Sequence, residues 1–378
     1  MATGQAAGEP VPAVDAGSAQ LPKRSVRGDW GAVTVNGRQV PIRAVVAVAG
    51  IVVWLGLMFL ETGAGGIASL WVSLLFLVPL VTIGSLTRSV GLALIGQFVL
   101  VGGLMLTVAW VLISLFTTVV PDLYAPIRDF VVPPIEEAAK FAPLVLILWF
   151  RRRGTAWSFG ATDLLLMGAA IGTGFGLVEL AYITGQGASL DSVPFLPIAE
   201  IYQGHLVVGH ALWATIDGGM LGIALLLQGR GRVAIVAAAA GVAWTTLDHI
   251  ANNYSAAHQG ALADLLLLLT ANGWGSLVFF VAVVVLAIAM DLRIVRTAVP
   301  RIPELAPPPL RGDLDSVAGA WAFRIGRRGL AYAVFRGREI PEAERPERAR
   351  MIGDLAYRLL SRQRPIALPK RATPGNAP

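Results

Sequence analysis

The amino-acid sequence predicts an all-α fold, a polytopic transmembrane helix bundle of about eight spans with a basic cytoplasmic tail. Of the 378 residues, 55% are hydrophobic and only 14% are charged, whereas soluble domains are about 45–50% apolar and about 25% charged. The mean hydropathy is +0.67. The apolar residues are gathered into blocks long enough to cross a bilayer, which takes roughly 20 helical residues.

The N-terminal residues 1–41 are polar and rich in Ala, Gly and Pro, without the apolar stretch of a cleaved signal peptide. We expect them to form a disordered cytoplasmic segment. The first apolar block would then act as a retained signal anchor.

Hydropathy predicts eight spans within a transmembrane domain over residues 42–291. The third and sixth spans are longer than one crossing requires, so we expect them to be tilted or to extend beyond the membrane surface. The apolar segment Ala263–Ala271 is too short to span and indicates a re-entrant or interfacial piece. The eight predicted spans are Ile42–Leu60, Leu70–Leu86, Gly91–Val119, Pro133–Phe150, Asp163–Thr184, Ile198–Leu227, Val233–Tyr254 and Asn272–Ala289.

The charges alternate from loop to loop. Lys and Arg occur in the N-terminal segment and after spans two, four, six and eight, whereas the other loops carry mainly Asp and Glu, with Arg128 as the exception. Because cytoplasmic loops carry the excess of Lys and Arg, both ends of the chain are predicted to be cytoplasmic. The predicted location is the cell membrane, as a multi-pass protein.

Residues 292–378 are predicted to form a basic, proline-rich cytoplasmic tail. They hold 17 Lys and Arg against 8 Asp and Glu, which accounts for a pI of about 10.0. Two weakly amphipathic stretches, Val317–Phe335 and Glu344–Leu360, follow a proline-rich linker. Such a tail lies against anionic lipid or stays disordered. No nucleic-acid partner is expected, because no reading motif accompanies the charge.

Spans one to three are almost free of ionisable side chains, which are concentrated in spans four to seven. Each costs at least about 2.5–3.5 kcal/mol at a helix centre, so each requires a reason. Taken singly, they can be explained by helix capping or interhelical hydrogen bonding. The predicted topology nevertheless brings acid, base and amide groups to the outer part of the membrane, which favours a site. The residues are Glu136, Glu137, Lys140, Glu179, His210, Asp217, Asp248 and His249, with Asn252 and Asn253 beside them.

Helical spacing pairs several of these residues. Side chains four residues apart share a helix face, which applies to Glu136 with Lys140, Phe175 with Glu179, and His249 with Asn253. Small residues at every fourth position of span five would let a neighbouring helix approach closely; these are Gly168, Gly172 and Gly176. Trp213 and Trp244 are interpreted as packing residues.

In chain order the motifs are EEAAK (Glu136–Lys140), FGLVE (Phe175–Glu179), GHALW (Gly209–Trp213) and HIANN (His249–Asn253). This series resembles the PrsW family of bacterial intramembrane proteases, part of the superfamily of CAAX-processing and bacteriocin-processing membrane proteases. The family pattern is EExxK, FxxxE, a histidine opening a helix segment, and HxxxN on successive spans. The resemblance covers a catalytic core over residues 133–254.

Two departures from the family pattern concern individual roles. The fourth residue after His210 is Ala214, so a partner of His210 must come from elsewhere, with Asp217 as one option. The last motif can start at Asp248 or at His249, and the second alignment is favoured.

Peptide hydrolysis needs a base for water, donors for the oxyanion and an acid for the leaving amine. The chain has no cysteine, and water is the expected attacking group. Glu136 or Glu137 is the proposed base. Glu179 and His210 would hold or share the proton, and His249 with Asn253 would stabilise the oxyanion. Lys140, Phe175 and Asp217 are supporting residues.

The resemblance implies a metal-free glutamate mechanism and no cofactor. Zinc is the alternative, because Glu and His are reasonable zinc ligands; its ligands would be Glu137, Glu179, His210 and His249. The resemblance also implies site-1-type cleavage of a membrane-anchored protein such as an anti-sigma factor, on the extracytoplasmic side.

Two other functions are compatible with the composition. A proton-coupled transporter would also use Glu and His chains, but no internal repeat is visible and the polar cluster is off-centre. A non-catalytic membrane scaffold of the same fold is the second alternative.

Overall fold

The computed structural model describes residues 32–35, 38–41, 74–151, 158–185, 199–202, 204–298, 317–337, 342–347 and 349. The chain divides into two compact units, Met1–Val52 and Val53–Pro378. In the first unit, strands β1 (Ala32–Val35) and β2 (Arg38–Pro41) pair as an antiparallel hairpin. This hairpin was not predicted from the composition of the N-terminal segment.

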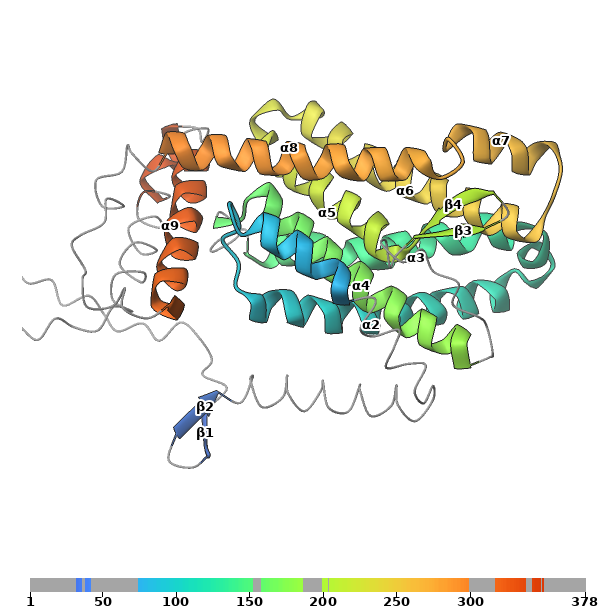
Figure 1. The fold of residues 1–378 in the computed structure, drawn as a ribbon, viewed down its shortest axis with the longest axis horizontal. Helices are drawn as coiled ribbons and strands as arrows, with labels where there is room; N and C mark the ends of the chain where they lie inside the picture. The colour runs from blue at the N-terminus through green and yellow to red at the C-terminus, as the bar shows by residue number, and fades with distance from the viewer. Residues whose placement is uncertain are drawn as a thin grey trace, which may run out of the picture. The chain divides into compact units, whose positions relative to one another are not determined.

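The described part of the second unit is mainly helical (Figure 1). Four helical segments are long and apolar enough to cross a membrane. They are α2 (Leu92–Val119), residues Ala161–Glu179 of α4 (Ala161–Gly185), α6 (Arg232–Ala257) and the stretch Ala261–Ala298. The predicted helical membrane fold is confirmed to this extent. The span Ile42–Leu60 lies outside the described residues, and the count of eight spans with its orientation stays a prediction.

Two further helices complete the bundle around the predicted site. They are α3 (Pro121–Arg151), which begins twelve residues before the predicted fourth span, and α5 (His210–Leu226). A shorter apolar helix, Leu74–Gly84, covers part of the predicted second span.

The predicted sixth span, Ile198–Leu227, is not one helix. Its first residues form an antiparallel hairpin of β3 (Ala199–Tyr202) and β4 (His205–Val208), and α5 begins at His210. The prediction is wrong here because hydropathy does not separate a short buried strand from a buried helix. His210 therefore opens a helix instead of lying about three turns along one, and this placement agrees with the family pattern.

The short apolar piece predicted at Ala263–Ala271 is a separate helix, α7 (Ala261–Leu269), followed by α8 (Trp274–Ala298). The turn between them places Ala271 and Asn272 at φ of 53° and 55° and Gly273 at φ of 79°. A side chain at Gly273 would overlap the carbonyl oxygen of Leu206 in β4. The α7–α8 turn therefore packs closely against strand β4 of the hairpin.

Helix α4 forms the centre of the bundle. In its apolar window 89% of the residues are buried, against 22–33% in the other three membrane-length segments. Helices α2 and α5 pack against it, and glycine makes the approach to α5 close. A side chain at Gly168 or Gly172 would overlap the carbonyl oxygen of Ala214 or His210. The predicted small-residue ridge is confirmed at these two glycines.

Part of the predicted tail is a helix, α9 (Val317–Gly337), which lies across the end of α8 (Figure 1). Tyr332 donates a hydrogen bond from its hydroxyl to the carbonyl of Thr87 at 2.8 Å, and Arg328 donates to Ser85 at 2.6 Å. The carboxylate of Asp291 in α8 accepts hydrogen bonds from the backbone N–H groups of Ala161 and Thr162 at the start of α4, at 2.9 and 2.7 Å. These bonds join the start of α4 to α8, and α9 to the segment that precedes α2.

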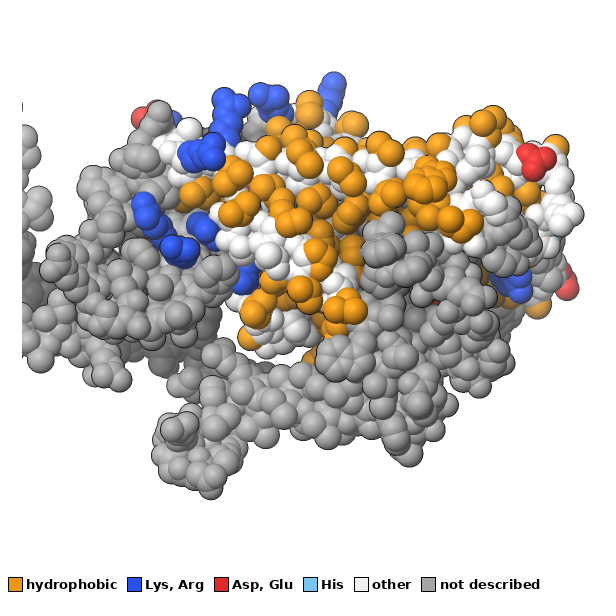
Figure 2. Space-filling view, in the orientation of Figure 1, with side chains coloured by type: hydrophobic (Ala, Val, Ile, Leu, Met, Phe, Trp, Pro, Cys, Tyr) orange, Lys and Arg blue, Asp and Glu red, His pale blue; other side chains and the backbone are white. Residues whose placement is uncertain are grey.

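The surface agrees with a membrane environment. Figure 2 shows a broad apolar region along α8, with basic side chains gathered toward the end where α9 lies. Val278, Val281 and Val285 of α8 are 51–69% exposed. Exposed apolar contact area on this scale is unfavourable in water and suits the hydrocarbon of a bilayer.

Candidate active site

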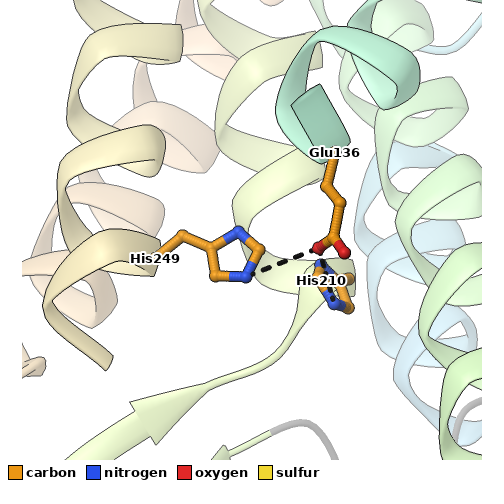
Figure 3. Close-up of side chains that lie close together, drawn as sticks. All are labelled: Glu136, His210 and His249. Carbon is orange, nitrogen blue, oxygen red and sulfur yellow. Dashed lines mark ion pairs between the residues drawn. The ribbon is translucent and has the colours of Figure 1, made fainter. Parts of the chain in front are cut away.

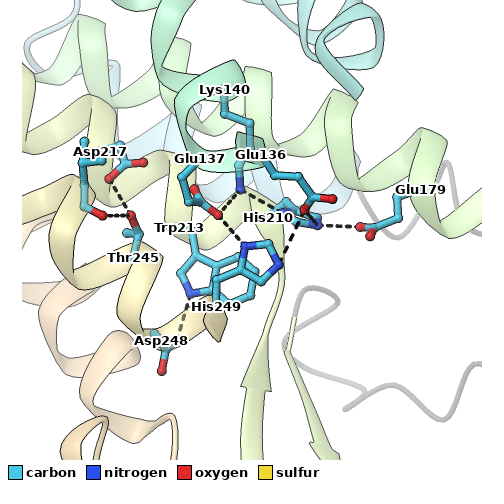
Figure 4. Close-up of polar contacts among 11 residues, drawn as sticks. Glu136, Glu137, Lys140, Glu179, His210, Trp213, Asp217, Thr245, Asp248 and His249 are labelled. Carbon is cyan, nitrogen blue, oxygen red and sulfur yellow. Dashed lines mark hydrogen bonds and ion pairs between the residues drawn. The ribbon is translucent and has the colours of Figure 1, made fainter. Parts of the chain in front are cut away.

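Four helices bring the predicted site residues into one cluster (Figure 4). Helix α3 supplies Glu136, Glu137 and Lys140, α4 supplies Glu179, α5 supplies His210, and α6 supplies His249. All are buried except Glu179, whose side chain is 30% exposed. The structure therefore assembles six of the residues selected from the sequence.

Glu136 faces both histidines (Figure 3). Its Oε2 lies 3.6 Å from His249 Nε2 and 3.9 Å from His210 Nε2. The two imidazole rings are 5.1 Å apart between centroids. Glu179 reaches His210 from the other side, with its Oε2 2.5 Å from Nε2. One carboxylate and two ring nitrogens thus point into a shared space, with a second carboxylate at its edge.

Glu137 is directed away from that space. Its Oε1 accepts a hydrogen bond from Lys140 Nζ at 2.6 Å and lies 2.8 Å from His249 Nδ1. Because a carboxylate only accepts, His249 carries a proton on Nδ1, and in the neutral ring the Nε2 lone pair then faces Glu136. Glu137 therefore orients His249, and its Oε2 is buried with no hydrogen-bond partner among the described residues.

Lys140 also contacts His210, with Nζ 2.8 Å from Nδ1. Since an ammonium only donates, His210 Nδ1 accepts and the ring proton lies on Nε2, facing Glu179. The cluster contains three carboxylates and one lysine: Lys140 pairs with Glu137, whereas Glu136 and Glu179 face His210. Buried charges in proteins are paired or bind metals, so the excess of negative charge favours an additional proton or cation.

Aromatic side chains enclose the histidines. The Phe175 ring lies 4.7 Å from the His210 ring, and the Trp213 ring is stacked on His249 at 4.3 Å. Trp213 Nε1 donates to Asp248 Oδ2 at 2.8 Å. The sequence interpretation treated Trp213 as a packing residue and Asp248 as the less favoured start of the last motif. The sequence did contain a signal that Trp213 lies at the site, because Trp213 is three residues after His210 and shares its helix face.

Two selected residues are not hydrogen-bonded to the cluster. Asp217 accepts from Thr245 Oγ1 at 2.9 Å on α6, so it is not the partner of His210. Asn253 is half-buried and makes no hydrogen bond with the described cluster residues. Its neighbour Asn252 is 4% exposed, and both amide atoms of its side chain lack a partner among the described residues.

The cluster fits a metal ion. Ligand atoms of Glu136, His210 and His249 lie within 4.8 Å of one another, and all three residues are buried. Imidazole nitrogen and carboxylate oxygen are zinc ligands, and Glu137 behind His249 is a typical supporting carboxylate. The set differs from the one expected from the sequence, in which Glu137 was a ligand and Glu136 was not. Binding through His210 Nε2 would release the proton that faces Glu179.

The comparisons with known proteins agree with the motifs. The model of the PrsW family intramembrane metalloprotease matches residues 87–290, which is 204 of the 378 residues. Comparisons with curated proteins and with solved structures give no match. The matched region contains all six cluster residues, and with the membrane-length helices it identifies a protease located in a membrane. The chain belongs to the PrsW family of intramembrane metalloproteases.

Proposed function

We propose that the protein is an endopeptidase that hydrolyses a peptide bond of a membrane-anchored protein, with Glu136, His210 and His249 holding a metal ion. The observation that carries the proposal is the convergence of these three buried side chains from α3, α5 and α6. A bound metal would polarise the scissile carbonyl and lower the pKa of water. The metal-free glutamate mechanism expected from the motifs is the alternative that the experiment below tests.

Glu179 is the carboxylate best placed to take the proton of the attacking water. Its side chain is 30% exposed, whereas those of Glu136 and Glu137 are 7% and 0% exposed. It lies 2.5 Å from His210 Nε2, at the edge of the shared space. A base must be within hydrogen-bond reach of the proton it takes. Glu179 then returns this proton to the leaving amine.

Glu137 and Lys140 hold the histidines and do not touch the substrate. Glu137 fixes the ring of His249 through Nδ1, and Lys140 links Glu137 to His210 Nδ1. This arrangement supports different roles for the two adjacent glutamates, which the sequence alone does not distinguish. Glu136 faces the reacting centre and Glu137 positions a ligand.

The depth of the cluster supports action near the extracytoplasmic surface. On α6, His249 is 17 residues after Arg232 at the basic end of the helix, which is about 26 Å at 1.5 Å per residue. The hydrocarbon core is about 30 Å thick. With basic ends in the cytoplasm, the site lies close to the outer boundary. A single-span protein such as an anti-sigma factor, as the resemblance implies, would reach it from that side.

The test is cleavage in liposomes containing the purified protein. The probe is a library of single-span peptides that share one transmembrane helix and differ in a randomised extracytoplasmic segment, with products read by mass spectrometry. Wild type is compared with Glu136→Gln, Glu179→Gln and the control Asp264→Asn on α7, each with and without a chelator. Without the chelator, we expect only wild type and the control to cleave the peptides. With the chelator, we expect neither protein to cleave them.

Each comparison in this experiment has a result that would contradict part of the proposal. Cleavage that persists in the chelator contradicts the metal and favours the glutamate mechanism. Cleavage by Glu179→Gln at the wild-type rate removes its role as base. A wild-type protein that cleaves no member of the library contradicts the proposed peptidase.

A further inference from the structure

Among the described residues, the β3–β4 hairpin is held along its β4 edge. On the β4 side, Leu206 N–H donates to the carbonyl of Asn272 in the α7–α8 turn at 2.9 Å. His205 Nε2 lies 3.5 Å from Ser255 Oγ on α6. Strand β4 then continues through Gly209 directly into His210 of the cluster (Figure 4). The hairpin is thus joined to the candidate active site by the chain itself.

The register directs the backbone groups of Ile201 to the other edge, along β3. Tyr202 and His205 flank a two-residue loop and are partners, followed by Ile201 with Leu206. In an antiparallel pair, hydrogen-bonded and non-hydrogen-bonded residue pairs alternate. Leu206 N–H points away from β3 toward Asn272, so its partner Ile201 directs its N–H and C=O to the opposite edge.

Ile201 is accessible at this edge. Its side chain is 60% exposed. Among the residues that the structure describes, no hydrogen bond involves its outward backbone groups. An unpaired strand edge is a template for another extended chain, and a two-stranded hairpin is only marginally stable by itself.

We propose that the outer edge of β3 binds the extended substrate segment as an added strand, and so presents its backbone to the cluster. This inference rests on the proposed function, because a peptidase must hold an extended main chain next to its reacting centre. Main-chain hydrogen bonds to a strand edge give affinity with little dependence on sequence. The occupant is the polypeptide flanking the transmembrane helix of a membrane-anchored protein.

The outer edge of β3 ends a short distance from His210. Ala199 pairs with Val208, two residues before His210, which is about 7 Å at 3.3 Å per strand residue. A segment paired along β3 and continuing past Ala199 therefore comes level with His210 after about two or three residues. The residues that pair with β3 are expected to lie within a few positions of the cleaved bond.

The first test removes the outward N–H of Ile201. Ile201→Pro deletes this donor without removing a hairpin hydrogen bond, and proline is tolerated at such edge positions. Ile201→Ala keeps the N–H and removes most of the side chain. With the peptide library in liposomes, we expect Ile201→Pro to lower cleavage at least tenfold and Ile201→Ala to lower it less than threefold. Equal cleavage by both variants and wild type overturns the strand pairing.

The second test does not depend on tolerance of proline. Because the chain has no cysteine, Ile201→Cys introduces a single thiol, and single-cysteine probe peptides are cross-linked to it by oxidation. We expect the yields along the probe to alternate with a period of two residues, the period of a strand. A period of three to four residues means a helical substrate and overturns the inference, as does a yield no higher than with Val236→Cys, an exposed position of α6.

The two proposals fail in different ways. If wild type cleaves the library and neither test supports pairing, only the strand edge is contradicted. If wild type cleaves nothing, the proposed peptidase is contradicted as well.

Discussion

The indole ring of Trp213 is stacked on the imidazole ring of His249, with centroids 4.3 Å apart and planes 22° from parallel. Trp213 Nε1 donates to Asp248 Oδ2 at 2.8 Å, which fixes the indole in its plane. Helix α5 therefore supplies one site histidine, His210, and the ring that holds the other. Together with the contact between Glu137 and Nδ1, this leaves His249 little freedom to turn.

Replacing Trp213 is expected to disturb His249 without removing a reacting group. We expect Trp213→Leu to lower cleavage by about 10–100-fold, the usual cost of removing a residue that supports a metal ligand. Asp248→Asn keeps an acceptor for the indole and is expected to lose less than Asp248→Ala. The control is Trp110→Leu, because Trp110 lies on α2, a helix that supplies no residue of the cluster. The measurement is cleavage of the peptide library together with bound zinc per protein; equal loss in both tryptophan variants would indicate a general packing defect.

Metal removal is expected to lower stability as well as activity. An ion that binds only the folded protein stabilises it by RT ln(1 + [L]/Kd), about 2.7 kcal/mol at a hundredfold excess over Kd. Thermal unfolding in detergent should therefore occur at a lower temperature after dialysis against a chelator and recover with zinc. Glu136→Gln, which removes one charged ligand of the group, should show a smaller difference between the two conditions. An unfolding temperature that does not respond to zinc in wild type would contradict a metal at this cluster.

The sequence predicted which polar residues lie together better than it predicted the helix bounds. Buried charges are costly in a membrane, so Glu136, Glu179 and His249 stood out in apolar helices, and all three meet in the cluster. The separate roles of the two adjacent glutamates depend on side-chain direction within one turn of α3. That direction is set by contacts with α5 and α6, and a single sequence does not contain it.

The hairpins were missed for two different reasons. The strand HLVV of β4 is as apolar as the helix after it, so hydropathy joined them into one span. In the N-terminal unit, β1 and β2 are separated by Asn36-Gly37, a typical sequence of two-residue hairpin loops. This signal is present in the sequence, but the expectation of disorder rested on the polar composition alone.

Asn252 is expected to matter more for catalysis than Asn253. Its amide is buried without a partner among the residues that the structure describes, on the buried face of α6 that also carries His249 and Ser255. A buried polar group without a partner costs about 1–3 kcal/mol, a cost that a bound peptide group would relieve. We expect Asn252→Ala to lower kcat at least tenfold while thermal stability is kept or raised, and Asn253→Ala to change kcat less than threefold. The opposite order would restore the alignment favoured from the motifs.

The hairpin is expected to loosen in acid through His205. Burial lowers the pKa of His205 below its usual value of 6.5, because the charged ring is poorly solvated there. The folded state therefore prefers the neutral ring, and its stability is present above pH 6.5 and is lost as the pH falls below it. Disulfide cross-linking at Ile201→Cys, with fixed probe and oxidant at each pH, should decline between pH 7 and 5 and decline less in the added His205→Gln background. His258→Gln is the control, since His258 contacts Asp129 elsewhere; an identical decline in all backgrounds would exclude His205 as the cause.

The tail helix α9 is expected to be a structural part of the membrane domain because its partners converge on the start of α4. Asp291 accepts two backbone N–H groups there, and Tyr332 binds the carbonyl of Thr87 at 2.8 Å. Removing a buried acceptor leaves its donors unsatisfied, at about 1–3 kcal/mol each. We expect Asp291→Ala to destabilise the protein by a few kcal/mol and Tyr332→Phe by about 1 kcal/mol, measured by unfolding in detergent.

Asp264→Ala, at an exposed carboxylate in the first turn of α7, serves as the control for loss of charge and is expected to change stability by less than about 0.5 kcal/mol. The expected order is Asp291→Ala, then Tyr332→Phe, then Asp264→Ala. If α9 only rested against lipid, Tyr332→Phe would equal the control and Asp291→Ala would keep its effect, because the N–H groups of Ala161 and Thr162 would still lose their acceptor. Comparison of the three variants therefore separates the capping of α4 from the docking of α9.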